Sequence, residues 1–197
     1  IQHFTDTPLG ISVLRNDPKS ALAIAMNVGA RFIRVPVLIG TMVSEDGMIG
    51  GKLNELCVYR KTLKNADNIQ VFANVTMNHI VPAPQRQTPW KAPLAYLEQV
   101  ILAIQKHSVA DGLIISSDEV PAESIAELRA QSELPILVGD AITPQHAAFY
   151  YQESNGLILA REIQKSTNYN LNDPPTIDVM KVEELVNAAR EALPASS

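Results

Sequence analysis

Six short runs of β-branched and other apolar residues alternate with six amphipathic stretches, and this alternation most limits how the chain can fold. The predicted strands cover residues 9–15, 32–38, 69–76, 112–117, 136–139 and 156–160. The predicted helices follow them at residues 18–28, 52–63, 93–107, 122–131, 144–153 and 177–192. Such alternation is typical of parallel strands with crossover helices, in either a doubly wound sheet or a (β/α)8 barrel.

The barrel is the better prediction, because the first strand is not followed by the Gly-x-Gly-x-x-Gly sequence of dinucleotide-binding sheets. A complete barrel has eight units and about 250 residues, whereas this chain has six units in 197 residues. We therefore expect an α/β fold, a TIM (β/α)8-type barrel whose first two units are missing. Residues 1–197 are expected to form one partial domain, with barrel units in 8–192 and a tail in 193–197. Its two open sheet edges predict that the chain folds poorly alone.

Charge and cysteine content exclude some classes of function. The net charge is −5, which argues against nucleic acid as a partner, because phosphate binding needs a clustered basic surface. The single cysteine, Cys57, excludes an internal disulfide framework and fits a reducing compartment. No apolar run approaches the roughly 18 residues of a membrane span. We expect a cytoplasmic protein, with attachment to a membrane surface and an organellar location left open because the sequence begins at Ile1 without a methionine.

Alternation along the first two strands divides their residues between the barrel interior and the helix layer. Arg15 is predicted to lie outward against the helices. Asn16 is predicted to point into the barrel mouth beside Arg34, as a candidate ligand-binding residue. Asp17 precedes Pro18 and a helical run, which predicts a helix N-cap. Arg34 is predicted to point inward, where it either forms a structural ion pair or binds a ligand, because a buried charge needs a partner.

The third strand places further polar residues at the mouth. Asn74 and Asn78 are predicted to point inward, and His79 stands at the end of the strand. His79 is a weak candidate for a general base or a metal ligand, and a hydrogen-bonded structural histidine is the alternative. No other histidine or cysteine has ligand spacing, so neither a metal nor a cofactor is expected.

Two loop regions are candidates for anion binding at the carboxyl ends of the strands, where barrel active sites lie. The glycine-rich stretch 40–51 can cradle an anion, close as a lid or simply turn, and its acidic pair Glu45 and Asp46 argues against phosphate. After the last two strands, Arg161 is a candidate clamp for an anion. Asp140 and Glu162 flank the same space and can neutralise that arginine instead.

Seven segments, in register with the predicted units, resemble one family. They are PLGISVLRND (8–17), ALAIAMNVGARFIRV (21–35), GTMVSEDGMIGG (40–51), YRKTL (59–63), FANVTMNH (72–79), ADGLIISS (110–117) and PILVGDAITP (135–144). The chain is similar to the BtpA/SgcQ family from about residue 8 to the last helix, and this resemblance implies a barrel of the phosphate-binding type. The N-terminal quarter of the family, with its first two units, has no counterpart here.

The resemblance implies alternative functions. One branch of the family is needed for accumulation of photosystem I reaction-centre proteins, which implies a biogenesis or stabilisation factor with membrane-protein subunits as partners. Other members imply a nucleosidase-like enzyme for a small phosphorylated sugar or nucleoside, with a pocket lined by Arg34, Asn74, Asn78, His79 and Arg161. A third reading is a catalytically impaired relative that binds a ligand or a second copy of itself.

The chain departs from the family where chemistry would be expected. Relatives typically carry Ala-Asp-Val-x-x-Lys-His in the third strand, where this chain has ANVTMNH at residues 73–79. Asn74 and Asn78 thus replace an acid and a base, and amides do not exchange protons as general acid or base near pH 7. Whether the chain is an enzyme is left open by the sequence.

Overall fold

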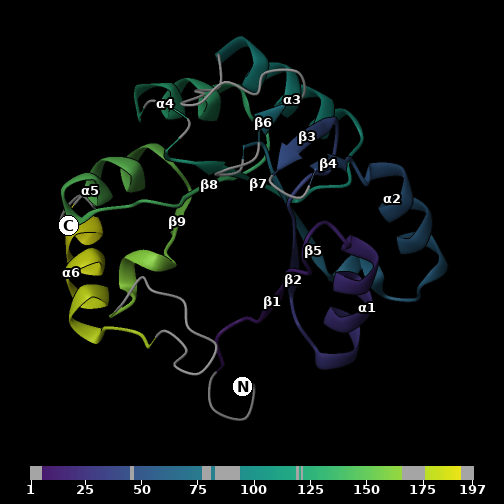
Figure 1. The fold of residues 1–197 in the computed structure, drawn as a ribbon, viewed down its shortest axis with the longest axis horizontal. Helices are drawn as coiled ribbons and strands as arrows, with labels where there is room; N and C mark the ends of the chain where they lie inside the picture. Colours follow the sequence, from purple (N-terminus) through teal and green to yellow (C-terminus); the bar gives the residue numbers. More distant parts are fainter. Residues whose placement is uncertain are drawn as a thin grey trace.

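Six parallel strands form the main sheet of the computed structural model, which describes residues 6–44, 47–76, 81–82, 94–118, 120, 122–165 and 176–191. The strands lie side by side in sequence order: β1 (Gly10–Ile11), β2 (Phe32–Val35), β5 (Gln70–Asn74), β7 (Gly112–Ser116), β8 (Ile136–Gly139) and β9 (Gly156–Ile158). Figure 1 shows this sheet curling round a central space, as in part of a barrel. The predicted partial TIM-type barrel is therefore confirmed.

Six helices lie on the outer side of the curled sheet (Figure 1). They are α1 (Pro18–Val28), α2 (Leu53–Thr62), α3 (Leu94–Lys106), α4 (Ala122–Gln131), α5 (Pro144–Glu153) and α6 (Val179–Arg190). Two short 3-10 helices, η1 (Ala66–Asn68) and η2 (Arg161–Ile163), precede β5 and follow β9. Among the helices of the described ranges, none is long and apolar enough to cross a bilayer.

The hydrophobic core lies between the outer face of the sheet and the helices. Alternate strand residues are fully buried there, because successive side chains of a strand point to opposite faces. Apolar helix residues at intervals of three and four complete the contact, as the spacing in α3 predicts. The principal members are Leu22, Ile33, Val35, Val71, Leu97, Ile101, Ile104, Leu113, Ile115, Leu128, Ile136 and Val138.

The beginning and end of α1 follow from its local sequence. Asp17 is the N-cap, and its Oδ1 accepts the Ser20 N–H at 3.0 Å, as predicted. Pro18 occupies the first turn, where its missing N–H costs nothing. Gly29 ends the helix at φ 68°, a left-handed conformation that favours glycine.

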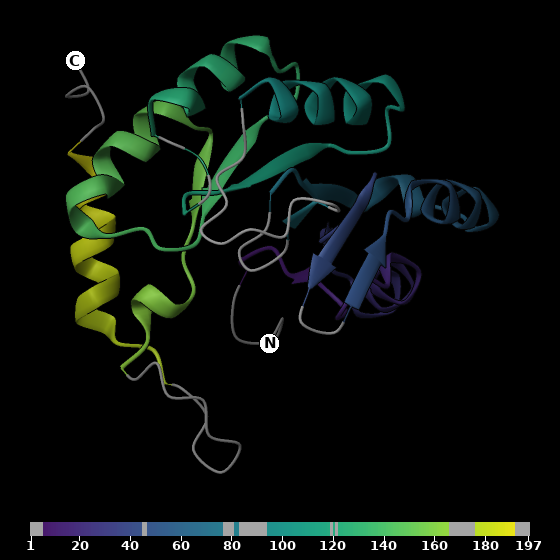
Figure 2. The same ribbon diagram turned by 45° about the horizontal axis from the view of Figure 1, so that its top comes forward.

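The glycine-rich stretch after β2 is a β-hairpin and not the loop that its glycine content predicts. Strands β3 (Thr41–Ser44) and β4 (Gly47–Gly50) pair antiparallel, and β6 (Val81–Pro82) joins β3 on its other side. The hairpin is visible as the two adjacent blue arrows in Figure 2. Met42 and Ile49 pack against Val37. This small apolar cluster, separate from the main core, fixes the hairpin against the residues that follow β2.

Candidate functional site

Two phenylalanines form the floor of the inner face of the sheet. The rings of Phe32 and Phe72 lie edge to face, with centroids 5.5 Å apart. Phe32 covers Gly10 and Phe72 covers Gly112 so closely that a Cβ at either glycine would overlap the ring. The glycines in β1 and β7 therefore make room for the aromatic side chains of β2 and β5.

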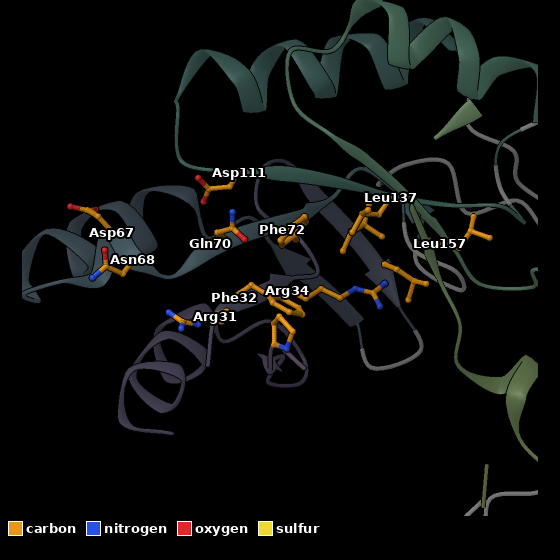
Figure 3. A pocket seen from close by; sticks show the side chains of 13 residues that line it. Arg31, Phe32, Arg34, Asp67, Asn68, Gln70, Phe72, Asp111, Leu137 and Leu157 are labelled. Atoms are coloured by element: carbon orange, nitrogen blue, oxygen red, sulfur yellow. The ribbon is translucent and has the colours of Figure 1, made fainter. Parts of the chain in front are cut away.

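A cavity of about 930 Å³ runs along this inner face (Figure 3). One end lies at residues that precede the strands, such as Arg31 and Asp111. The middle is walled by aromatic and aliphatic side chains from five strands, namely Phe32, Phe72, Ile114, Leu137, Leu157 and Ile158. A predominantly apolar hollow with a few polar groups is typical of a small-molecule site.

Arg34 is the positively charged residue beside the apolar middle of the cavity, and its side chain points inward, as predicted. Figure 3 shows its side chain extending from β2 toward the side of the cavity that Leu137 and Leu157 line. Its Nε donates to Asn74 Oδ1 on the neighbouring strand β5 at 2.9 Å. Neither Nη atom has a hydrogen-bond partner among the residues that the structure describes. The four N–H donors of the two Nη atoms thus have no partner among the described residues and are available to a ligand.

The partly buried environment of Arg34 disfavours the positive charge of its guanidinium group. Burial lowers the pKa of Arg34, and the negative charge of Asp140 opposes that shift. Asp140 does not reach salt-bridge distance, so the predicted alternative of a structural ion pair is absent from the described residues. The guanidinium stays protonated at neutral pH, because arginine remains charged in proteins even when it is partly buried. A partly buried cation without an ion-pair partner among the described residues favours an anionic ligand.

A chain of hydrogen bonds fixes Asn74, the second predicted residue of the site. Its Nδ2 donates to the Thr76 carbonyl at 2.9 Å, which leaves Oδ1 directed to Arg34. Thr76 Oγ1 in turn accepts the Ser116 N–H at 2.8 Å. Asn74 is buried, so its amide is held in one orientation and positions the guanidinium beside it.

Asn16 does not stand beside Arg34 in the mouth, contrary to the prediction. Its Nδ2 donates to the carbonyls of Val37 and Gly50 at 2.8 and 3.1 Å, and its Oδ1 accepts the Val37 N–H. The reason is that β1 ends at Ile11, so the alternation of a strand does not continue to residue 16. Asn16 therefore ties the β1–α1 turn to the base of the hairpin. For the same reason Arg15 is exposed, and does not lie under the helices.

Arg161 lies at a separate place, at the carboxyl ends of β8 and β9. It is exposed in η2 and lines a smaller cavity of about 200 Å³ with Asp118, Asp140, Ala141, Ala160 and Glu162. The structure thus brings Arg34 and Asn74 together and separates Arg161 from them. The remaining predicted residues, Asn78 and His79, lie outside the described residues.

Sequence reasoning missed Phe32 and the role of Glu162. Phe32 shares the inward parity of Arg34, so alternation could have found it. The Glu162 carboxylate accepts hydrogen bonds from the backbone of two loops, and no sequence spacing signals such a contact. Within the described ranges, no three His, Cys, Asp or Glu side chains are grouped to hold a metal ion.

Comparison with solved structures places the fold among the barrels. The chain is similar to N-(5'-phosphoribosyl)anthranilate isomerase from Pyrococcus furiosus, with a TM-score of 0.61 and 14% identity over 96% of this chain and 77% of that one. A thiamine phosphate pyrophosphorylase from the same organism gives a TM-score of 0.56, with 13% identity over 96% of this chain and 70% of that one. At these identities the similarity shows the fold alone.

Sequence comparison shows the family. The chain is 33% identical to the Photosystem I biogenesis protein BtpA of Synechocystis over 98% of its own length and 64% of that protein. It is 31% identical to an uncharacterised protein of Methanocaldococcus jannaschii, over 97% of this chain and 68% of that one. The chain thus spans slightly less than two thirds of the Synechocystis relative. The model of the BtpA family matches residues 1–191, and the chain belongs to that family.

Proposed function

We propose that the chain is a biogenesis or stabilisation factor of the BtpA type, which acts by binding a small anionic ligand at Arg34 rather than by acid–base catalysis. The observation that carries the ligand site is the Arg34–Asn74 pair at the apolar cavity, with both Nη atoms unpartnered among the described residues. Neither an arginine nor an amide exchanges protons near pH 7. The biogenesis role is supported by the 33% identity to the Synechocystis protein.

A chimera tests the biogenesis role. The matching segment of Synechocystis BtpA is replaced by this chain in a strain that lacks its own BtpA, and photosystem I reaction-centre subunits are measured by immunoblot. We expect the chimera to restore the subunits, with membrane-protein subunits as its partners. A chimera that accumulates to the level of authentic BtpA and restores nothing would contradict the proposal.

An enzyme for a small phosphorylated sugar or nucleoside is the second candidate. The observation in its favour is Asp140, a carboxylate after β8 that raises the pKa of Arg34 and lines the smaller cavity at the carboxyl ends of the strands. A substrate that binds only the native state raises the unfolding free energy by about 2.7 kcal/mol at 100 times its Kd. Thermal melting with a panel of sugar phosphates and nucleosides at millimolar concentration tests this candidate, and a panel without any shift would count against it.

A further inference from the structure

One carboxylate joins the ends of the last two strands of the sheet. Glu162 Oε1 accepts the N–H of Ala141, which follows β8, at 2.6 Å. Its other oxygen, Oε2, accepts the N–H of Ala160, which follows β9, at 2.8 Å. The 2.8 Å distance is in the range of charge-assisted hydrogen bonds, and the 2.6 Å distance is slightly shorter. The two oxygens of one anion are thus held by backbone donors from two neighbouring loops.

The loop after β8 adopts a costly conformation where it makes this contact. Asp140 and Ala141 have φ values of 63° and 52°, in the left-handed region. That region costs a non-glycine residue roughly 1–2 kcal/mol, less for aspartate than for alanine. Backbone N–H groups in such turns form concave sites for anions. In this chain the anion that fills the site is the side chain of Glu162.

The same position has a recognised use in barrels. The loops after the last two strands of (β/α)8 barrels frequently hold the phosphate group of a ligand. Here these loops line the 200 Å³ cavity that contains the Glu162 carboxylate. Three of its lining side chains, Asp118, Asp140 and Glu162, carry negative charge, and Arg161 alone carries positive charge. A phosphate would therefore find the Ala141 and Ala160 N–H groups already bonded to Glu162, in a cavity whose lining is negatively charged.

We propose that Glu162 is a built-in anion that occupies the oxyanion position between the ends of β8 and β9 and excludes phosphate from it. The ligand of this barrel then carries its negative charge at Arg34 and not at the ends of β8 and β9, which rests on the anion site of the proposed function. Whatever occupies Arg34, removal of the Glu162 carboxylate opens a second site, specific for an oxyanion.

Titration of the full chain with inorganic phosphate tests this exclusion, with chloride at equal ionic strength as the reference. The shifts of the Ala141 and Ala160 amide resonances report binding at the two donors. We expect no saturable shift in the wild type and saturation at millimolar phosphate in Glu162→Ala, an affinity gain of at least tenfold. Ala141 and Ala160 are exposed, so water can replace the lost carboxylate without unfolding the loops.

Two further variants serve as a charge control and as a stronger test of phosphate binding. Glu183→Ala removes one charge from an exposed position of α6 and is expected to behave as the wild type. Glu162→Ala combined with Asp140→Asn removes a repelling carboxylate, and asparagine tolerates the left-handed φ of residue 140. We expect this double variant to bind phosphate more tightly than Glu162→Ala. Phosphate binding by the wild type at these two amides, or none by either Glu162 variant, would overturn the proposal.

Discussion

Asp17 shows at the scale of one residue how a side chain sets a helix boundary. Its carboxylate accepts hydrogen bonds from the Ser20 hydroxyl at 2.6 Å and the Ser20 N–H at 3.0 Å. The hydroxyl contact is the main reason that the pKa of Asp17 lies below its ordinary value of 3.8. A lowered pKa means that the carboxylate stabilises the fold above pH 4, and that this contribution is lost as the pH falls through the folded-state pKa.

Asp17→Ala is therefore expected to lower the free energy of unfolding by about 1 kcal/mol at pH 7, and by less at pH 3. Urea denaturation at the two pH values measures the difference. Asp17→Asn is the matched control, because asparagine caps a helix nearly as well and should lose little at pH 7. An equal loss for alanine at both pH values would show that the charge contributes nothing.

Ala141 permits a second prediction at this scale. Its φ of 52° is strained for alanine and unstrained for glycine. Ala141→Gly should raise the free energy of unfolding by about 0.5–1 kcal/mol, the strain relieved less the extra entropy of unfolded glycine. Ala126→Gly, inside α4, is the contrasting control and should lower stability by about 1 kcal/mol. Destabilisation by both changes would contradict the left-handed assignment.

At the scale of elements, Arg60 connects α2 to the loops that precede two strands. Its Nη1 donates to the Val109 carbonyl at 3.2 Å, and its Nη2 to the Ile69 carbonyl at 3.0 Å. Arg60→Ala is expected to cost about 2–3 kcal/mol, because hydrogen bonds to charged groups are worth about 1.5–3 kcal/mol. Chemical denaturation measures this loss. Exposed Lys61 on the same helix is the control, and Lys61→Ala should stay within about 0.5 kcal/mol of the wild type. Equal effects of the two changes would contradict the bridging role.

Elements with strong local signals were predictable from the sequence. The bounds of α1, α4, α5 and β8 agree with the prediction, since caps, proline and hydrophobic spacing act locally. The hairpin at 41–50 was missed because glycines at both ends masked its short alternating pattern. Parity correctly placed Arg34 and Asn74 on the inner face of the sheet. It failed for Asn16, since the end of β1 depends on the tertiary contacts of the following turn.

At the scale of the whole molecule, the curled sheet has two edges, β1 and β9, each with one neighbour among the described strands. An eight-stranded barrel would need two more strands between them. Open edges and an apolar inner face favour association. We predict that the 197-residue chain binds the dye ANS and sediments as a concentration-dependent oligomer. A monomer at all concentrations that binds no dye would contradict this expectation.

Binding of a small anion at Arg34 is the central claim, and calorimetric titration with benzoate tests it most directly. Benzoate combines a carboxylate for the Arg34 Nη atoms with an aromatic ring for the Phe32–Phe72 floor. The wild type should bind benzoate at millimolar concentration, and Arg34→Met should weaken binding at least tenfold. Arg31→Met, an equal loss of charge at the far end of the cavity, should leave binding unchanged. Equal benzoate affinity in all three proteins would contradict the assignment of Arg34 as the anion anchor.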